Sequence, residues 1–139
     1  MRCLFQALKA ANPKVKLAYH SCGSILPIIP DLIDIGLEVL NPIQPGAQGM
    51  DLGRLKGEYG QRLAFFGGVD EQTILPFGTP DQVAEEVRLR VRQAAAGGGF
   101  IIAPAHNIQP DTPLANIHAF FEAVRRWGRY PLQGTAGEG

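Results

Sequence analysis

The sequence predicts an α/β protein whose parallel sheet is built from four consecutive βα units. Short apolar runs with the character of strands alternate with longer segments that have helical periodicity. The alternation repeats about every 30 residues, as expected for βα units. Each short run is apolar throughout, which is typical of strands covered on both faces. Strands that alternate with helices in this way form parallel sheets with right-handed crossovers.

The composition is that of one globular domain. The chain has 139 residues, of which 45% are hydrophobic and 19% charged, and its formal net charge is zero. This balance argues against non-specific binding to nucleic acids or to anionic membranes. No apolar run has the length of a membrane span, and the start of the chain is too polar for a signal peptide. Two cysteines do not make a disulfide framework, so we expect a cytoplasmic protein with reduced thiols.

In the first part of the chain, glycine and proline mark the element boundaries. Pro13 ends a first helix, and Gly36 suits the position after the end of a second. Pro30 is unfavourable deep in a helix, so the second helix is expected to start near Asp31. The predicted elements are a helix over 2–11, a strand over 15–19, a helical pattern over 25–35 and a strand over 37–40.

In the second part, capping residues mark the helix starts. Asp51 is expected to cap one helix, and Thr79 with Gln82 forms a capping-box pattern for another. In that later helix, valines share one face, while charged residues such as Glu86 are expected outside. Residues 1–132 are predicted to form one domain, and residues 133–139 a flexible tail. The predicted elements are a helix over 51–59, strands over 63–66 and 100–103, a loop over 71–78, a helix from the Thr79 cap to the glycines at 97–99, and a last helix over 112–128.

Each predicted strand runs into polar residues at its carboxyl end. Polar residues prefer loops in any case. The carboxyl ends of strands also carry the active site in parallel α/β folds, and we interpret the pattern in that sense. The residues are His20 and Cys22, Asn41 and Gln44, Asp70 and Gln72, and His106 and Gln109.

The first of these pairs is half of a possible zinc site. His20 and Cys22 are two residues apart, so in an extended chain their side chains point the same way. A lone thiol is more often a small buried hydrophobe than a ligand, and two ligands do not hold a catalytic metal. His106 is the candidate for the third ligand. It follows the fourth strand, which lies three strand spacings from the first. The side chains of His20, Cys22 and His106 must therefore lean inward to share one ion.

Five motifs carry a family resemblance that covers residues 15–127. They are HSCGSI from His20, LNPIQP from Leu40, FFGGVD from Phe65, FGTPDQV from Phe77 and IIAPAHNIQPDTP from Ile101. In this order they resemble the C-terminal part of the uroporphyrinogen decarboxylase superfamily, which includes the decarboxylase itself and cobalamin-dependent methyltransferases acting on methylated corrinoid proteins. The resemblance implies an enzyme with a (β/α)8 TIM barrel, of which this chain would supply the C-terminal half.

A half barrel leaves open sheet edges and an uncovered inner face, which favours association. The partner would be the N-terminal half of the barrel or a second copy of the chain. Alone in solution, the chain is therefore expected to dimerise or aggregate.

In the methyltransferase branch, the resemblance implies that His20 and Cys22 bind Zn²⁺. His106 stands where that branch has a cysteine as the third ligand. The partners would be a small-molecule thiol and a methylcorrinoid protein, and the thiolate would attack the methyl group. The other implied site residues are Asp70 as a catalytic or orienting group, and Asn41, Gln44, Gly67, Gly68 and Gln72 around the substrate.

In the decarboxylase branch, a histidine matching His106 contacts the porphyrinogen, and no cofactor is needed. Its substrate carboxylates require cations, whereas the Lys and Arg residues of this chain lie on predicted helices. Methyl transfer is therefore preferred over decarboxylation. A third alternative is an inactive half barrel that serves only as an interaction subunit.

Overall fold

The computed structural model describes residues 1–132, which form a four-stranded parallel sheet with helices between the strands. The strand order is β1-β2-β3-β4, with each strand beside its neighbour in sequence, as expected for consecutive units of a (β/α)8 barrel. The predicted tail over 133–139 lies outside the described residues. The strands are β1 (Ala18–His20), β2 (Val39–Ile43), β3 (Ala64–Val69) and β4 (Phe100–Pro104).

All four strands were predicted, but their bounds differ: β1 is shorter and starts later than expected, β2 lies over 39–43 rather than 37–40, and β3 continues to residue 69 rather than 66. Leu17 donates its backbone N–H to the Glu38 side chain at 3.0 Å, and the Val15 carbonyl accepts from Lys9 Nζ at 2.6 Å. The Leu17 carbonyl does accept the backbone N–H of Val39 at 3.0 Å, but the Leu17 N–H bonds a side chain, and the register of paired residues begins at Ala18.

The helices also follow the predicted order, with two differences. The pattern over 25–35 divides into a 3₁₀ turn, η1, and a short helix, α2, because Pro27 and Pro30 each suit only the first turn of a helix. The predicted loop over 71–78 contains the four-residue helix α4. The helices are α1 (Arg2–Ala11), η1 (Leu26–Ile28), α2 (Ile29–Asp34), α3 (Leu52–Tyr59), α4 (Ile74–Phe77), α5 (Pro80–Ala94) and α6 (Leu114–Trp127).

Both predicted helix caps are confirmed. The Asp51 side chain accepts from Arg54 N at 2.7 Å and starts α3. Thr79 and Gln82 form a complete capping box at the start of α5. No helix among residues 1–132 is long and apolar enough to cross a membrane.

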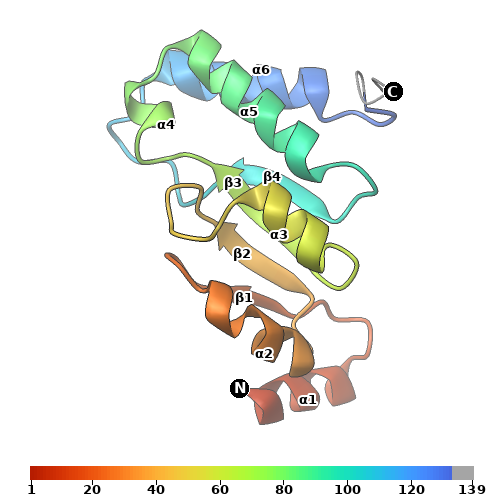
Figure 1. The fold of residues 1–139 in the computed structure, drawn as a ribbon. Coiled ribbons are helices and arrows are strands. Elements are labelled where there is room, and N and C mark those ends of the chain that lie inside the picture. The colour runs from red at the N-terminus through yellow and green to blue at the C-terminus, as the bar shows by residue number, and fades with distance from the viewer. Residues whose placement is uncertain (133–139) are drawn as a thin grey trace.

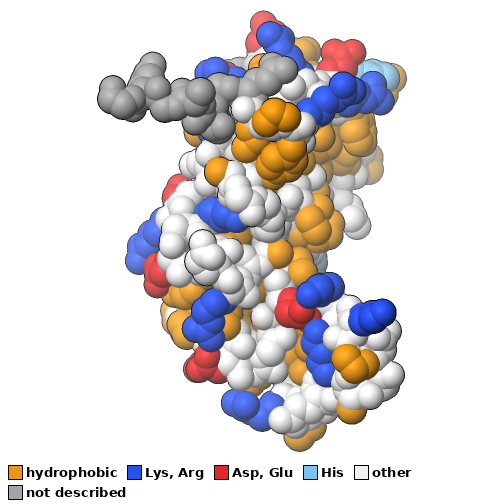
Figure 2. All heavy atoms as spheres, turned by 90° about the vertical axis from the view of Figure 1, so that its right-hand side faces the viewer, with side chains coloured by type: hydrophobic (Ala, Val, Ile, Leu, Met, Phe, Trp, Pro, Cys, Tyr) orange, Lys and Arg blue, Asp and Glu red, His pale blue; other side chains and the backbone are white. Residues whose placement is uncertain are grey.

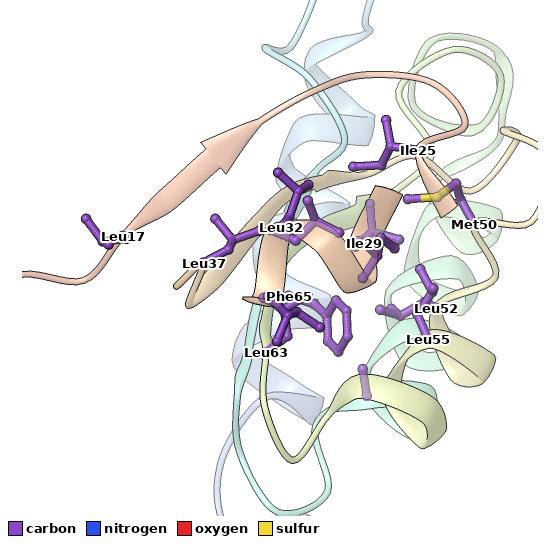
Figure 3. Packing of buried hydrophobic residues seen from close by; sticks show 14 of the residues in the cluster. Leu17, Ile25, Ile29, Leu32, Leu37, Met50, Leu52, Leu55, Leu63 and Phe65 are labelled. Atoms are coloured by element: carbon purple, nitrogen blue, oxygen red, sulfur yellow. The ribbon is translucent and has the colours of Figure 1, made fainter. Parts of the chain in front are cut away.

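Figure 1 shows how the helices are arranged against the sheet. The core lies between the sheet and the helices that follow its strands, in two clusters. In the first, Phe65 of β3 is fully buried with Leu52 and Leu55 of α3 and Ile29 of α2 (Figure 3). In the second, Val83 and Val87 of α5 pack with Phe120 of α6. The opposite face of the sheet has no such cover in the described chain, and Ile101 of β4 is 50% exposed there.

Two polar side chains are buried within this framework. Glu86 was predicted to lie outside, and that prediction is wrong. Its carboxylate pairs with Arg90 at 2.8 Å and accepts the Asp70 backbone N–H at 3.3 Å, which makes its burial tolerable. Asn116 of α6 donates to the carbonyls of Leu75 and Gly78, both at 2.8 Å, and so joins α6 to α4.

Glu38 makes the stability of the fold dependent on pH. Hydrogen bonds from Lys16, then Lys9, lower the pKa of the Glu38 carboxyl from 4.5 to about 2. The resulting stabilisation is complete above pH 4.5 and is lost as the pH falls from 4.5 towards 2. A shift of this size corresponds to about 3 kcal/mol without screening. Lys16 is 75% exposed, so we expect a loss of order 1 kcal/mol.

Urea unfolding at pH 6 and pH 3 checks this expectation. Glu38→Gln should lower the free energy of unfolding at pH 6 and make it less dependent on pH. Glu58→Gln, which alters an exposed pair with Arg54 at 3.8 Å, is the matched control. An unchanged pH dependence in Glu38→Gln would contradict the assignment.

Candidate functional site

The structure brings the three predicted metal ligands together. The donor atoms of His20, Cys22 and His106 all lie within 4.8 Å of one another, and all three residues are exposed. Three strand spacings in a flat sheet span about 14 Å. The side chains at the two edges of this sheet therefore do lean inward. The imidazole rings of His20 and His106 meet edge to face, with centroids 6.1 Å apart.

Asn41 fixes the orientation of the His20 ring. Strand pairing sets Asn41 opposite His20, and the Asn41 Oδ1 lies 2.7 Å from His20 Nδ1. An amide oxygen only accepts, so Nδ1 carries the proton and the Nε2 lone pair can accept a hydrogen bond or bind a metal. Asn41 Nδ2 donates to the Phe66 carbonyl at 3.4 Å, which holds the amide in this orientation. His20 Nε2 points at the Cys22 Sγ, 3.5 Å away.

This donor set fits a tetrahedral transition-metal ion such as Zn²⁺. Two imidazole nitrogens and one thiolate are characteristic zinc ligands, and three protein ligands leave the fourth position open. Ligand atoms around tetrahedral zinc lie about 3.5 Å apart, so the donors need to approach only by about 1 Å. Exposed side chains can make that movement by small torsional changes. A hydrogen-bonded second nitrogen, as on His20, is the usual arrangement in histidine ligands of metals.

Three other predicted site residues form a separate polar cluster at the same end of the sheet. Gln44 accepts the Gly23 backbone N–H at 2.9 Å and donates to Gln72 Oε1 at 3.0 Å. Asp70 accepts the backbone N–H groups of Gln72 and Thr73 at 2.8 and 3.0 Å, and the Thr73 hydroxyl also donates to it. These bonds shape the loops after β1, β2 and β3. The proposed contacts of these residues with substrate remain a prediction.

The two glycines at the end of β3 have a packing role. Gly67 and Gly68 both have positive φ, 113° and 93°. A Cβ on Gly67 would lie 3.1 Å from Ile43 N, and one on Gly68 would lie 3.2 Å from the Leu52 side chain. Close packing in the fold therefore accounts for both glycines, and their approach to a ligand stays a prediction.

An apolar pocket adjoins the three ligand residues. It has a volume of about 640 Å³, and His20 and His106 are both part of its wall. Phe121 of α6, 50% exposed, also lines it, and no part in a site was predicted for this residue. The other lining residues are Asn41, Phe66, Ile102, Ala103, Pro104, Ala105, Asn107, Ile108 and Phe120.

His106 also borders a second, acidic pocket of about 380 Å³. Its carboxylates are Glu71 and Asp111. Burial raises the pKa of the Glu71 carboxyl, the charge of Asp70 raises it further, and His106 opposes both effects. Sequence analysis gave Glu71 no role. Its only signal was its place directly after Asp70 at a strand end.

Comparisons with known proteins agree with this architecture. The family described as Uroporphyrinogen decarboxylase (URO-D) matches residues 1–127. A uroporphyrinogen decarboxylase of Pelodictyon phaeoclathratiforme is 30% identical over 125 residues, which are 86% of this chain and 33% of that protein. A methylcobamide:CoM methyltransferase, MtaA, of Methanosarcina barkeri is 33% identical over 108 residues, which are 75% of this chain and 29% of that protein.

A solved structure shows the same fold. A methyltransferase from Methanosarcina mazei superposes with a TM-score of 0.70 at 27% identity, over 93% of this chain and 36% of that one. The chain thus spans about a third of the length of the relatives it matches. Its four βα units correspond to part of a TIM barrel. With the family match extending over nearly all of the described residues, the chain belongs to the uroporphyrinogen decarboxylase (URO-D) family.

Proposed function

We propose that this chain is the zinc-binding part of a URO-D family enzyme that transfers a methyl group from a methylcorrinoid protein to a thiol. His20, Cys22 and His106 would be the ligands. The observation that carries the proposal is the bond of 2.7 Å between His20 Nδ1 and Asn41, which leaves the Nε2 lone pair directed at the Cys22 sulfur, 3.5 Å away. A histidine that only filled space at a strand end would not need this fixed tautomer.

Each residue would have a defined task in that reaction. Bound zinc supplies a Lewis acid that keeps the acceptor thiol as a thiolate at neutral pH. Asn41 orients His20, and the Cys22 thiolate contributes the negative charge among the three ligands. Two of the three ligands, His20 and His106, line the apolar pocket, in which the acceptor would lie.

Methyl transfer is expected only from a closed barrel. The relatives are about three times as long as this chain, and the inner face of the described sheet is open. The remaining βα units would come from a longer polypeptide, a separate chain or a second copy.

The decarboxylase relatives support a second candidate, a metal-free site acting on a porphyrinogen. Its substrate carboxylates need cations, and among the described residues neither pocket is lined by Lys or Arg. Methyl transfer therefore ranks first. An inactive subunit would bind neither zinc nor substrate, so the experiment below also tests that alternative.

Zinc binding by the purified chain tests the proposal. The chain should retain about one zinc per molecule after dialysis, measured by elemental analysis. Asn41→Leu should weaken zinc binding by about 10- to 100-fold in a competition titration, because it removes the group that orients His20. Gln48→Leu, which removes an exposed amide outside the site, should bind zinc as the wild type does. A folded wild-type chain that retains no zinc would contradict the proposal.

A further inference from the structure

We propose that the thiol accepted at this site is uncharged and has an apolar body about the size of an aromatic ring. The inference rests on the proposed function, because it describes what binds beside the ligand triad. It concerns the specificity of the site, which membership in the family leaves open.

The pocket that adjoins the triad has the chemistry of an apolar binding site. His20 and His106 belong to its wall, so the pocket lies directly beside the ligand triad, and the inference places the substituent of a metal-bound thiol in this space. Phe66, Phe121 and Ile102 supply large apolar surfaces, and the polar groups other than the histidines are the amides of Asn41 and Asn107. A volume of about 640 Å³ leaves ample room for one aromatic ring. Small-molecule sites commonly combine apolar walls with a few polar groups in this way.

Charge around the triad disfavours an anionic acceptor. In the described chain, neither pocket that borders His106 is lined by Lys or Arg, and the second is lined by the carboxylates of Glu71 and Asp111. A sulfonate or carboxylate on the thiol would meet no cation that the described chain supplies in these pockets, and it would lie near the carboxylates of Glu71 and Asp111. Figure 2 shows Lys and Arg side chains spread over the end of the molecule where the strands begin, which is opposite the site. An acceptor without charge avoids this repulsion and buries apolar surface.

Two thiols of matched shape test the inference directly. Benzyl mercaptan and 4-(mercaptomethyl)benzoate share the thiol and the ring and differ by one carboxylate. The probe is the chain loaded with Co²⁺, whose visible absorption changes when a thiolate enters the coordination sphere. Benzyl mercaptan should bind at least about tenfold more tightly, a preference that salt should reduce but not remove. Equal affinity, or tighter binding of the benzoate, would overturn the inference.

Variants of two pocket residues test whether these side chains determine the preference for the uncharged thiol. Phe121→Ala should weaken benzyl mercaptan binding by about fivefold and leave ethanethiol unchanged, because the lost surface contacts only the ring. Phe77→Ala is the matched control, since Phe77 is 77% exposed and lies outside the pocket. Asn107→Arg should improve binding of the benzoate by several-fold. An unchanged affinity in both pocket variants would show that the pocket is not used.

The outcomes separate this inference from the proposed function. A chain that binds neither Co²⁺ nor any thiol would refute the metal site, and the inference with it. A chain that binds Co²⁺ and responds equally to ethanethiol, benzyl mercaptan and the benzoate would leave the metal site standing and refute only the apolar acceptor.

Discussion

Phe65→Ala is expected to lower the free energy of unfolding by about 3–5 kcal/mol, the usual cost of removing a fully buried phenylalanine. The Phe65 side chain is 0% exposed and packs in the cluster between the sheet and helices α2 and α3. The surrounding structure relaxes only partly around such a cavity, so the cavity adds to the cost of the lost burial. Urea unfolding followed by circular dichroism measures the loss.

The next residue in the same strand is a matched control. Phe66 points to the other face of the sheet, where it is half-buried and lines the apolar pocket. Phe66→Ala should cost about 1 kcal/mol, because much of this surface is already in water. Equal losses in the two variants would contradict the conclusion that helices cover only one face of the sheet.

Cys22→Ser is expected to weaken zinc binding by at least about 100-fold, more than any change outside the ligand set. The thiolate is the anionic ligand among the three, and a serine hydroxyl is a much poorer donor to zinc. The triad is exposed, so the apo variant should stay folded. Competition with a chromophoric chelator measures the affinity, and circular dichroism of the apo protein checks the fold.

The other cysteine of the chain provides a control for the Cys22→Ser variant. Cys3 is free and exposed on α1, outside the ligand set. Cys3→Ser should bind zinc with wild-type affinity. Zinc that is lost to the same extent in both variants, or in neither, would refute the assignment of Cys22 as a ligand.

Local patterns in the sequence were sufficient to predict most of the fold. Apolar runs of strand length and capping residues such as Asp51 and Thr79 act within a few residues, so their signals are readable without tertiary structure. The start of β1 was not predictable in this way. It depends on Glu38, a residue from the next βα unit, which binds the Leu17 backbone. Glu86 escaped prediction because its burial depends on a contact with the Asp70 backbone, 16 residues away, as well as on the local pair with Arg90.

The candidate site was likewise predictable only where it depends on local sequence. The two-residue spacing of His20 and Cys22, and a histidine after the last strand, predicted the triad that the structure brings together. The partnership of His20 with Asn41 depends on strand register, which the sequence does not reveal. The apolar pocket combines β3, β4 and α6, and no single stretch of sequence contains its pattern.

The placement of the ligands on the first and last strands has a consequence for the sheet itself. An ion held by His20, Cys22 and His106 would act as a cross-link between the two edges of the sheet, enclosing most of the chain in one loop. Such a cross-link restricts the unfolded chain and opposes flattening of the sheet, as a disulfide across a long loop would. The metal would thereby maintain the curvature of the sheet on which closure of a barrel depends. The same ion that takes part in the reaction would then also stabilise the fold.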